Sequence, residues 1–194
     1  AFAQTWHSAD AHLIIGEIRA PRTLGAWLTG ALLGLAGAVA QGLFRNPLAD
    51  PYLLGSASGA SLGVVVVLAS KILAGSAAGL AVAGVTARLG LVGAAFVGAL
   101  LGVVLTLALA RGAQQTTRLL LAGVVVGVVL AAISDLITTA APDALRGKQT
   151  FMLGSTGFLG WSSCALLAVG LALTLPLVMR LSRTLDALVL GEDS

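Results

Sequence analysis

The chain has 194 residues, of which 58% are hydrophobic and only 10% are charged, and its formal net charge is +3. A soluble domain of this size carries about 25% charged residues, so this composition excludes an ordinary soluble domain and indicates a membrane protein. The basic residues are scattered singly along the sequence, which excludes the clustered basic face of a nucleic-acid-binding protein.

Five stretches are long and apolar enough to be membrane helices. A helix needs about 20 consecutive apolar residues to cross the hydrocarbon core of a bilayer. The stretches 23–43, 53–74, 89–110, 119–141 and 161–179 meet this length. They predict an all-α, polytopic transmembrane helix bundle with about five membrane-spanning helices, since the alternation of a membrane β-barrel is absent.

The first 20 residues are too polar for a span, and they lack the order of a signal peptide. They contain the only two histidines, His7 and His12. Outer-loop histidines are more often solvated than metal-bound, and the single cysteine, Cys164, lies in an apolar run, so we expect no metal site and no intramolecular disulfide.

Small residues recur at four-residue spacing in several of the expected spans. Such residues let helix backbones approach closely in a membrane. The expected packing positions are Gly30, Gly34 and Gly42 in the first span, and Gly55, Gly59 and Gly63 in the second. Similar ridges follow at Ala94, Gly98 and Gly102, and at Gly123 and Gly127. We expect the first ridge, through Gly34, to meet another helix in the assembled protein.

A polar turn separates the first two spans. Pro47 and Pro51 lack an amide hydrogen, and each drives the preceding residue out of the helical region. The turn should therefore end the first helix abruptly, with Asp50 placed to cap the next helix and Pro51 in its first turn. Local physics predicts a rigid turn but does not explain its elaborate sequence.

The run RAPRTLGAWLTGALLGLAGAVAQGLFRNPLADPYLLGSASGASLG, residues 19–63, closely resembles the FecCD-type ABC permeases, which import iron-siderophores, haem and cobalamin. The family pattern is matched by Arg19, Pro21, Arg22, Gln41, Asn46, Pro47, Leu48, Ala49, Asp50, Pro51, Leu54, Gly55 and Gly59. Three further stretches are similar to later family segments: TTRLLLAGVVVG (116–127), FMLGSTGFLGW (151–161) and LDALVLGED (185–193).

The resemblance implies a non-enzymatic permease subunit in the bacterial cytoplasmic membrane. Family permeases have ten membrane helices, and this chain would be a fragment supplying the second to the sixth. The implied partners are a second permease subunit in a homo- or heterodimer, two ATP-binding subunits, and a periplasmic or lipid-anchored substrate-binding protein. ATP would be used by the partner, with no cofactor bound by this chain.

The resemblance also implies an orientation. Residues 1–20 would lie outside, and residues 44–52, 111–118 and 180–194 would be cytoplasmic. Charge alone does not orient the chain, because lysine and arginine divide almost equally between the two sides.

Site residues are carried over position by position. The resemblance implies two cytoplasmic gates, formed by Asn46, Pro47 and Leu48 and by Gln115, Thr116 and Thr117. It places the start of the ATPase-coupling segment at 184–194, with Leu188, Leu190, Gly191 and Glu192. Candidate residues of the translocation path are Asp135, Met152, Ser155 and Thr156. Simple turn, loop and capping roles remain the alternatives for these residues, and Asp135 could instead pair with a basic residue or have a structural role at the membrane interface.

Two other functions stay open from the residues alone. An ion-coupled secondary transporter would carry coupling-ion groups near mid-membrane, for which Asp135 alone is thin support. A membrane scaffold that transports nothing is the third reading. The sequence contains no catalytic constellation and no Walker motif, so the energy for transport must come from another subunit. The ligand itself cannot be named from these residues.

Overall fold

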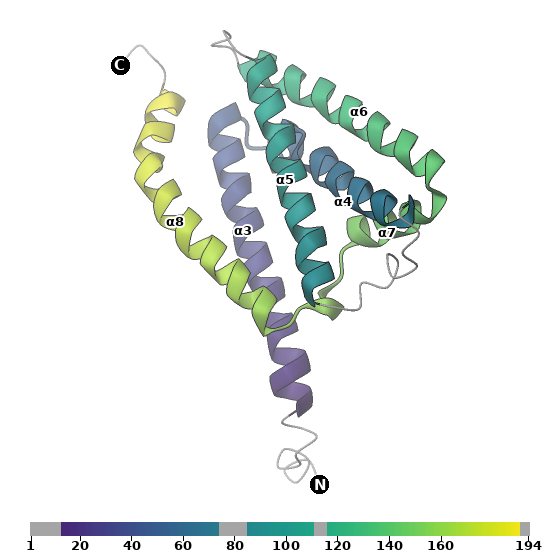
Figure 1. Ribbon diagram of the computed structural model, residues 1–194. Coiled ribbons are helices and arrows are strands. Elements are labelled where there is room, and N and C mark those ends of the chain that lie inside the picture. Colours follow the sequence, from purple (N-terminus) through teal and green to yellow (C-terminus); the bar gives the residue numbers. More distant parts are fainter. Residues whose placement is uncertain (1–12, 74–84, 111–115, 191–194) are drawn as a thin grey trace. The chain divides into compact units, whose positions relative to one another are not determined.

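The computed structural model describes residues 13–73, 85–110 and 116–190 (Figure 1). Within these ranges all regular structure is helical, as the sequence predicted. The elements in order are η1 (Ile14–Arg19), α3 (Ala20–Phe44), η2 (Pro51–Leu54), α4 (Ser56–Leu73), α5 (Val85–Leu109), α6 (Thr116–Ala140), α7 (Pro142–Leu153), η4 (Thr156–Phe158) and α8 (Trp161–Leu190). Of the short elements, η1 is a π-helix, and η2 and η4 are 3-10 helices.

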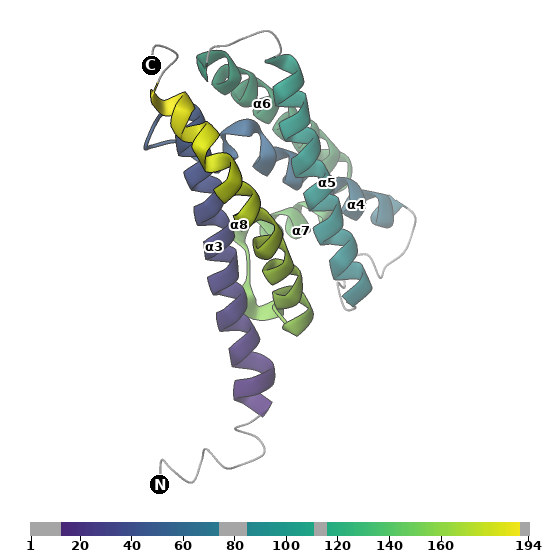
Figure 2. The same ribbon diagram turned by 90° about the vertical axis from the view of Figure 1, so that its left-hand side faces the viewer.

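The chain divides into two compact units. The first consists of Ala1–Asp50 and Ser155–Ser194, and the second is Pro51–Gly154. In the first unit α3 and α8 pack side by side, although they are far apart in sequence (Figure 2). In the second unit α4 packs against α5, α6 and α7.

Four helices in the described residues are long and apolar enough to cross a membrane, judged by length and composition. They are Ile14–Phe44, Gly90–Leu109, Thr117–Ala140 and Trp161–Ser182. The remaining expected span corresponds to α4, which has 18 residues and contains a shorter apolar helix, Ser56–Ser70. A helix of that length rises about 27 Å, slightly less than the hydrocarbon core of about 30 Å.

Several helix ends differ from the sequence expectation; α5 and α6 begin three or four residues early, and three other differences are instructive. The first helix was expected over 23–43, but the chain is already helical from Ile14, with the charged residues Glu17 and Arg19 exposed. The second was expected from Leu53, but Pro51–Leu54 form a separate 3-10 turn, and Gly55 adopts a φ of 76° before α4 begins. The last was expected to end at Met179, but α8 continues to Leu190, because the polar residues beyond Met179 are compatible with a helix.

The short helix α7 was not expected from the sequence. It begins with Pro142 at its first position, where the missing amide hydrogen costs nothing. Its face toward α4 carries small residues: Ala144 is fully buried, and a Cβ added to Gly147 would overlap the side chain of Leu68. This contact fixes α7 along α4.

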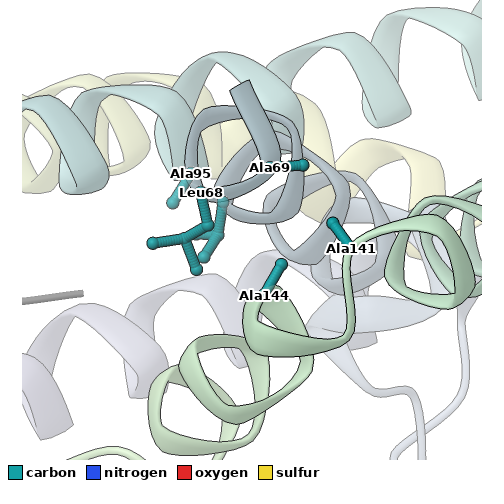
Figure 3. Close-up of a cluster of buried hydrophobic side chains, with 6 residues drawn as sticks. Leu68, Ala69, Ala95, Ala141 and Ala144 are labelled. Atoms are coloured by element: carbon teal, nitrogen blue, oxygen red, sulfur yellow. The ribbon is translucent and has the colours of Figure 1, made fainter. Parts of the chain in front are cut away.

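Buried apolar side chains form a cluster where α4, α5 and α7 meet (Figure 3). The residues drawn there include Leu68 and Ala69 from α4, Ala95 from α5, and Ala141 and Ala144 at the start of α7. Most of these side chains are small, so the helices approach closely, and backbone-to-backbone contact replaces interdigitated large side chains.

The glycines of the second expected ridge do pack closely. A Cβ on Gly59 would overlap the carbonyl oxygen of Gly98, and one on Gly63 would overlap that of Ala94. Gly55 packs against α6, where its added Cβ would lie 3.4 Å from Val126. The ridges on α4 and α5 therefore face each other directly.

The first ridge is different. A Cβ added to Gly30 or Gly34 would meet no atom within 4 Å in the described part of the chain. These two glycines therefore make no close helix contact here, and the expected partner of this ridge stays a prediction. Gly42 lies near the end of α3, where its carbonyl accepts the amide hydrogen of Arg45 at 3.3 Å.

Candidate functional site

The polar turn after α3 is closed by backbone hydrogen bonds. Arg45 ends the helix in the left-handed conformation, with φ 48° and ψ 38°. The amide of Asn46 reaches back to the Gln41 carbonyl at 3.2 Å, and the amide of Arg45 donates to Gly42. This pairing satisfies carbonyls that the end of a helix leaves open, so the sharp end predicted from Pro47 is formed by a defined cap.

Side chains then fix the gate residues proposed from the sequence. The Asn46 carboxamide oxygen accepts the Leu48 amide hydrogen at 2.9 Å, which is an Asx turn. The Gln41 side chain donates to the Pro47 carbonyl at 2.9 Å, and the Ala49 amide donates to the Asn46 carbonyl at 3.0 Å.

This turn presents one apolar side chain outward. Leu48 is 88% exposed, whereas its neighbour Ala49 is buried. A rigid loop with an exposed leucine at its tip is suited to pack against another surface and close an opening. The gate role of Asn46, Pro47 and Leu48 stays a prediction.

The other expected gate is only partly described. Gln115 lies outside the described residues, while Thr116 is the first residue of α6 and Thr117 follows it. Thr117 is exposed. The structure therefore places these two threonines at a helix start, which is also where a capping role would put them.

Asp135, the acidic residue inside the fourth expected span, forms an ion pair. Its carboxylate accepts from the Lys148 ammonium at 2.6 Å. The Lys148 side chain is 14% exposed and that of Asp135 is 69% exposed. The pair joins the last turns of α6 to α7, which agrees with the pairing alternative considered from the sequence.

The remaining path residues lie along the stretch of chain that leads from one unit into the other. Met152 is exposed near the end of α7, and Gly154 follows it with a φ of 67°, a conformation that suits glycine. The Ser155 hydroxyl accepts the Gly157 amide hydrogen at 3.1 Å and caps the short helix η4, which Thr156 begins. Met152 belongs to the second unit, whereas Ser155 and Thr156 belong to the first.

One contact region was not identified from the sequence. The Trp161 indole at the start of α8 donates to the carbonyl of Gly16 in η1 at 3.2 Å and so ties η1 to α8. The Cys164 thiol donates to the Pro21 carbonyl at 3.0 Å. Gly25 permits this approach, because an added Cβ would lie 2.8 Å from Leu159. The sequence carried two signals for it: Gly25, which stands outside the four-residue ridge, and Pro21, which lacks an amide hydrogen.

The described residues contain no group of three or more His, Cys, Asp or Glu side chains that could hold a metal ion. The histidines His7 and His12 lie outside them. The turn, the ion pair and the α3–α8 contacts hold neighbouring segments in fixed positions.

A comparison with protein families decides what kind of chain this is. The model of the FecCD transport family matches residues 1–194. The chain belongs to the FecCD transport family. It is accordingly a polytopic membrane protein, and the resemblance inferred from the Arg19–Gly63 run is confirmed.

Curated relatives of this FecCD chain include vitamin B12 import system permease proteins BtuC. The chain is 38% identical over 192 residues to the protein from Salmonella paratyphi A, covering 97% of this chain and 55% of that relative. The protein from Klebsiella pneumoniae subsp. pneumoniae is also 38% identical over 192 residues, with 54% of its length covered. The chain therefore spans about half the length of these relatives.

A solved structure supports the fold of this FecCD chain. It is described as an inward-facing conformation of a metal-chelate type ABC transporter, and it is similar with a TM-score of 0.79 at 24% identity. The similarity covers 96% of this chain and 56% of that one. At 24% identity this similarity supports the fold and nothing about function.

The residues expected to couple to an ATPase lie at the end of the FecCD chain. Leu188 and Leu190 belong to the last turn of α8, whereas Gly191 and Glu192 lie outside the described residues. The expected turn between a membrane helix and a separate coupling helix therefore does not begin before Leu190.

Proposed function

We propose that this chain is part of the permease subunit of an ABC importer that moves a cobalamin-type metal chelate across a membrane. The observation that carries the proposal is the 38% identity to vitamin B12 import permeases across nearly the whole chain. The family match over all 194 residues supports the same class. Iron-siderophores and haem are the competing ligands, because the family resemblance implied all three.

The proposal includes the partners of such an importer. These are a second permease subunit, two ATP-binding subunits that bind and hydrolyse ATP, and a substrate-binding protein. The membrane is the bacterial cytoplasmic membrane. The exposed apolar side chains along α8, among them Leu166, Val169 and Leu173, support a lipid or protein environment around this helix, since exposed apolar patches of this kind are uncommon in water.

In this proposal the turn Arg45–Asp50 is a cytoplasmic gate. Two features support that role: the hydrogen bonds of Gln41 and Asn46 hold the turn as one unit, and Leu48 is bare at its tip. A seal against a bulky ligand needs turns that move as rigid bodies, since a flexible loop would have to be reordered at each closure.

The acidic residue near the end of α6 has a different role in this proposal. Asp135 is paired with Lys148, so its charge is already balanced within the chain. We assign Asp135 to holding α7 on α6, and this pairing weakens the case for a coupling-ion site. The ion-coupled transporter therefore ranks below the ABC importer.

The test is uptake by the full-length protein with its partners in proteoliposomes. Labelled cyanocobalamin, a ferric siderophore and haem are offered with ATP trapped on the ATPase side, and the control carries an ATPase subunit with its Walker lysine replaced. We expect ATP-dependent cyanocobalamin uptake that the control lacks. ATP-dependent uptake of only another chelate would overturn the cobalamin assignment, and gradient-driven uptake without the ATPase would overturn the importer.

A further inference from the structure

The first turns of the long N-terminal helix leave one carbonyl without a backbone donor. In the π-helix Ile14–Arg19, the amide of Ala20 donates five residues back, to the carbonyl of Ile15. The Gly16 carbonyl would therefore receive its bond from residue 21. Residue 21 is a proline, which has no amide hydrogen.

Neither helical register supplies the missing bond. In an α-helix the donor to Gly16 would be Ala20, but that amide is used on Ile15. In the π-helical register the donor would be Pro21. Gly16 is half-buried, and a carbonyl that is shielded from water without a hydrogen bond is unfavourable, so a donor from another element is favoured.

Trp161, the first residue of α8, is that donor. Its indole nitrogen lies 3.2 Å from the Gly16 carbonyl oxygen. We propose that the Trp161 indole takes the place of the amide hydrogen that Pro21 lacks, and that this bond positions the start of α8 and the loop before it. Pro21 leaves the Gly16 carbonyl without a backbone donor, and the Trp161 indole donates to it instead.

Neighbouring contacts show what the bond positions. The Cys164 thiol, one turn further along α8, donates to the carbonyl of Pro21 itself at 3.0 Å. Arg22 donates to the Gly157 carbonyl at 3.1 Å, in the segment that also carries Ser155 and Thr156. The Pro21 segment thus offers two carbonyls to α8 and one guanidinium to the loop, and all these residues lie within one compact unit.

This inference goes beyond the proposed function, because it concerns a bond within the chain and holds whatever ligand is moved. Trp161 is a positioning residue in it. The same account links the proline of the R-A-P-R run to the tryptophan that begins α8.

The test is a double-mutant cycle in the full-length protein in detergent. Trp161→Phe removes the donor and keeps most of the ring, and we expect the apparent melting temperature to fall by about 2–4 °C, as the loss of one hydrogen bond implies. Pro21→Ala restores an amide hydrogen that can reach Gly16. In that background, Trp161→Phe should cost less than half as much.

The control is Trp27→Phe, which changes an exposed tryptophan on α3 and should give the same shift in the parent and in the Pro21→Ala background. A ring-packing loss at Trp161 would also be equal in both backgrounds, so only the hydrogen bond predicts unequal shifts. Equal shifts for Trp161→Phe would overturn the inference.

A spectroscopic measurement keeps the test decisive if a variant fails to fold. In the unmodified protein labelled with ¹⁵N-tryptophan, the indole proton of Trp161 should exchange with solvent at least tenfold more slowly than that of Trp27. Its resonance is assigned by its absence in Trp161→Phe, or by segmental labelling of the part of the chain that contains α8. An exchange rate equal to that of Trp27 would refute the bond.

Discussion

Replacing Gly98 with alanine should force α4 and α5 apart. A Cβ at this position would overlap the Gly59 carbonyl oxygen and lie 3.0 Å from the Gly59 carbonyl carbon and 3.2 Å from the Gly63 Cα. All three are backbone atoms, so no side-chain rotation relieves the overlap. The helices must separate by roughly 1 Å to restore ordinary contact distances, and the packing along both ridges weakens with that separation.

The magnitude follows from this geometry. Overpacking a close interior contact costs about 1–3 kcal/mol, which corresponds to a fall of about 2–12 °C in melting temperature at about 2–4 °C per kcal/mol. The matched control is Gly93→Ala in the same helix, where an added Cβ meets no atom of the described residues within 4 Å. Alanine there should be neutral or stabilising by up to about 1 kcal/mol, because it is the better helix former.

The assay is the apparent melting temperature of the purified full-length protein in detergent, with both variants measured side by side. We expect Gly98→Ala to melt below the parent, and Gly93→Ala at or above it. If both variants melted with the parent, the close approach of α4 and α5 would be wrong. If both fell equally, any added side chain on α5 would be harmful, and the particular contact with Gly59 would not be the cause.

Three further outcomes are expected from the same protein. Asn46→Ala should cost about 0.5–1.5 kcal/mol and slow uptake, while Asn46→Asp, which keeps an acceptor for the turn, should cost less; an aspartate as harmful as alanine would contradict the Asx turn. In the left-handed conformation a non-glycine residue costs about 1 kcal/mol of stability, so Arg45→Gly should raise the melting temperature. A lower melting temperature would argue against that conformation of residue 45. A double-mutant cycle of Asp135→Asn and Lys148→Met should give a coupling below about 1 kcal/mol that weakens in high salt, because Asp135 is largely exposed; a salt-independent coupling above about 2 kcal/mol would mean a buried pair.

The turn at Asn46 shows how far local sequence can go. Two prolines and an asparagine within a few residues predict a sharp and rigid end to the helix, since each restricts its own backbone or that of its neighbour. The structure has that end. The bond from Gln41 to the Pro47 carbonyl was not predicted, although both residues belong to the family pattern, because spacing does not say which way a side chain turns.

The glycine ridges show a limit of prediction from local sequence. The spacing of Gly30 and Gly34 is the same as that of Gly59 and Gly63, and both pairs were expected to pack. Only the second pair meets another helix within the described residues. Periodicity places small residues on one face of a helix, but it carries no information about what covers that face, which is a property of the tertiary or quaternary structure.

The charged positions show a related limit of sequence reasoning. Glu17 and Arg19 contributed to the expectation that the first 20 residues are too polar for a span, and within them Ile14–Arg19 is helical and continuous with α3. Composition counts charges, but a helix at a membrane surface can expose them on one side or near its end, where they reach water. The length of an apolar run therefore does not fix where the helix begins and ends.

Proline shows the same limit of sequence reasoning. It indicates that a hydrogen-bond donor is missing, but not which group replaces that donor. Pro21 guarantees that a carbonyl one turn earlier lacks its usual partner, and that much is readable from one letter of sequence. The substitute, the Trp161 indole, is 140 residues further along the chain from Pro21, and only the packing of α8 on α3 brings the two together. A proline inside an apolar helix therefore predicts that a donor must be found elsewhere, and the tryptophans, serines and threonines of neighbouring helices are where to search, because they can donate a hydrogen bond without bringing a charge into the membrane.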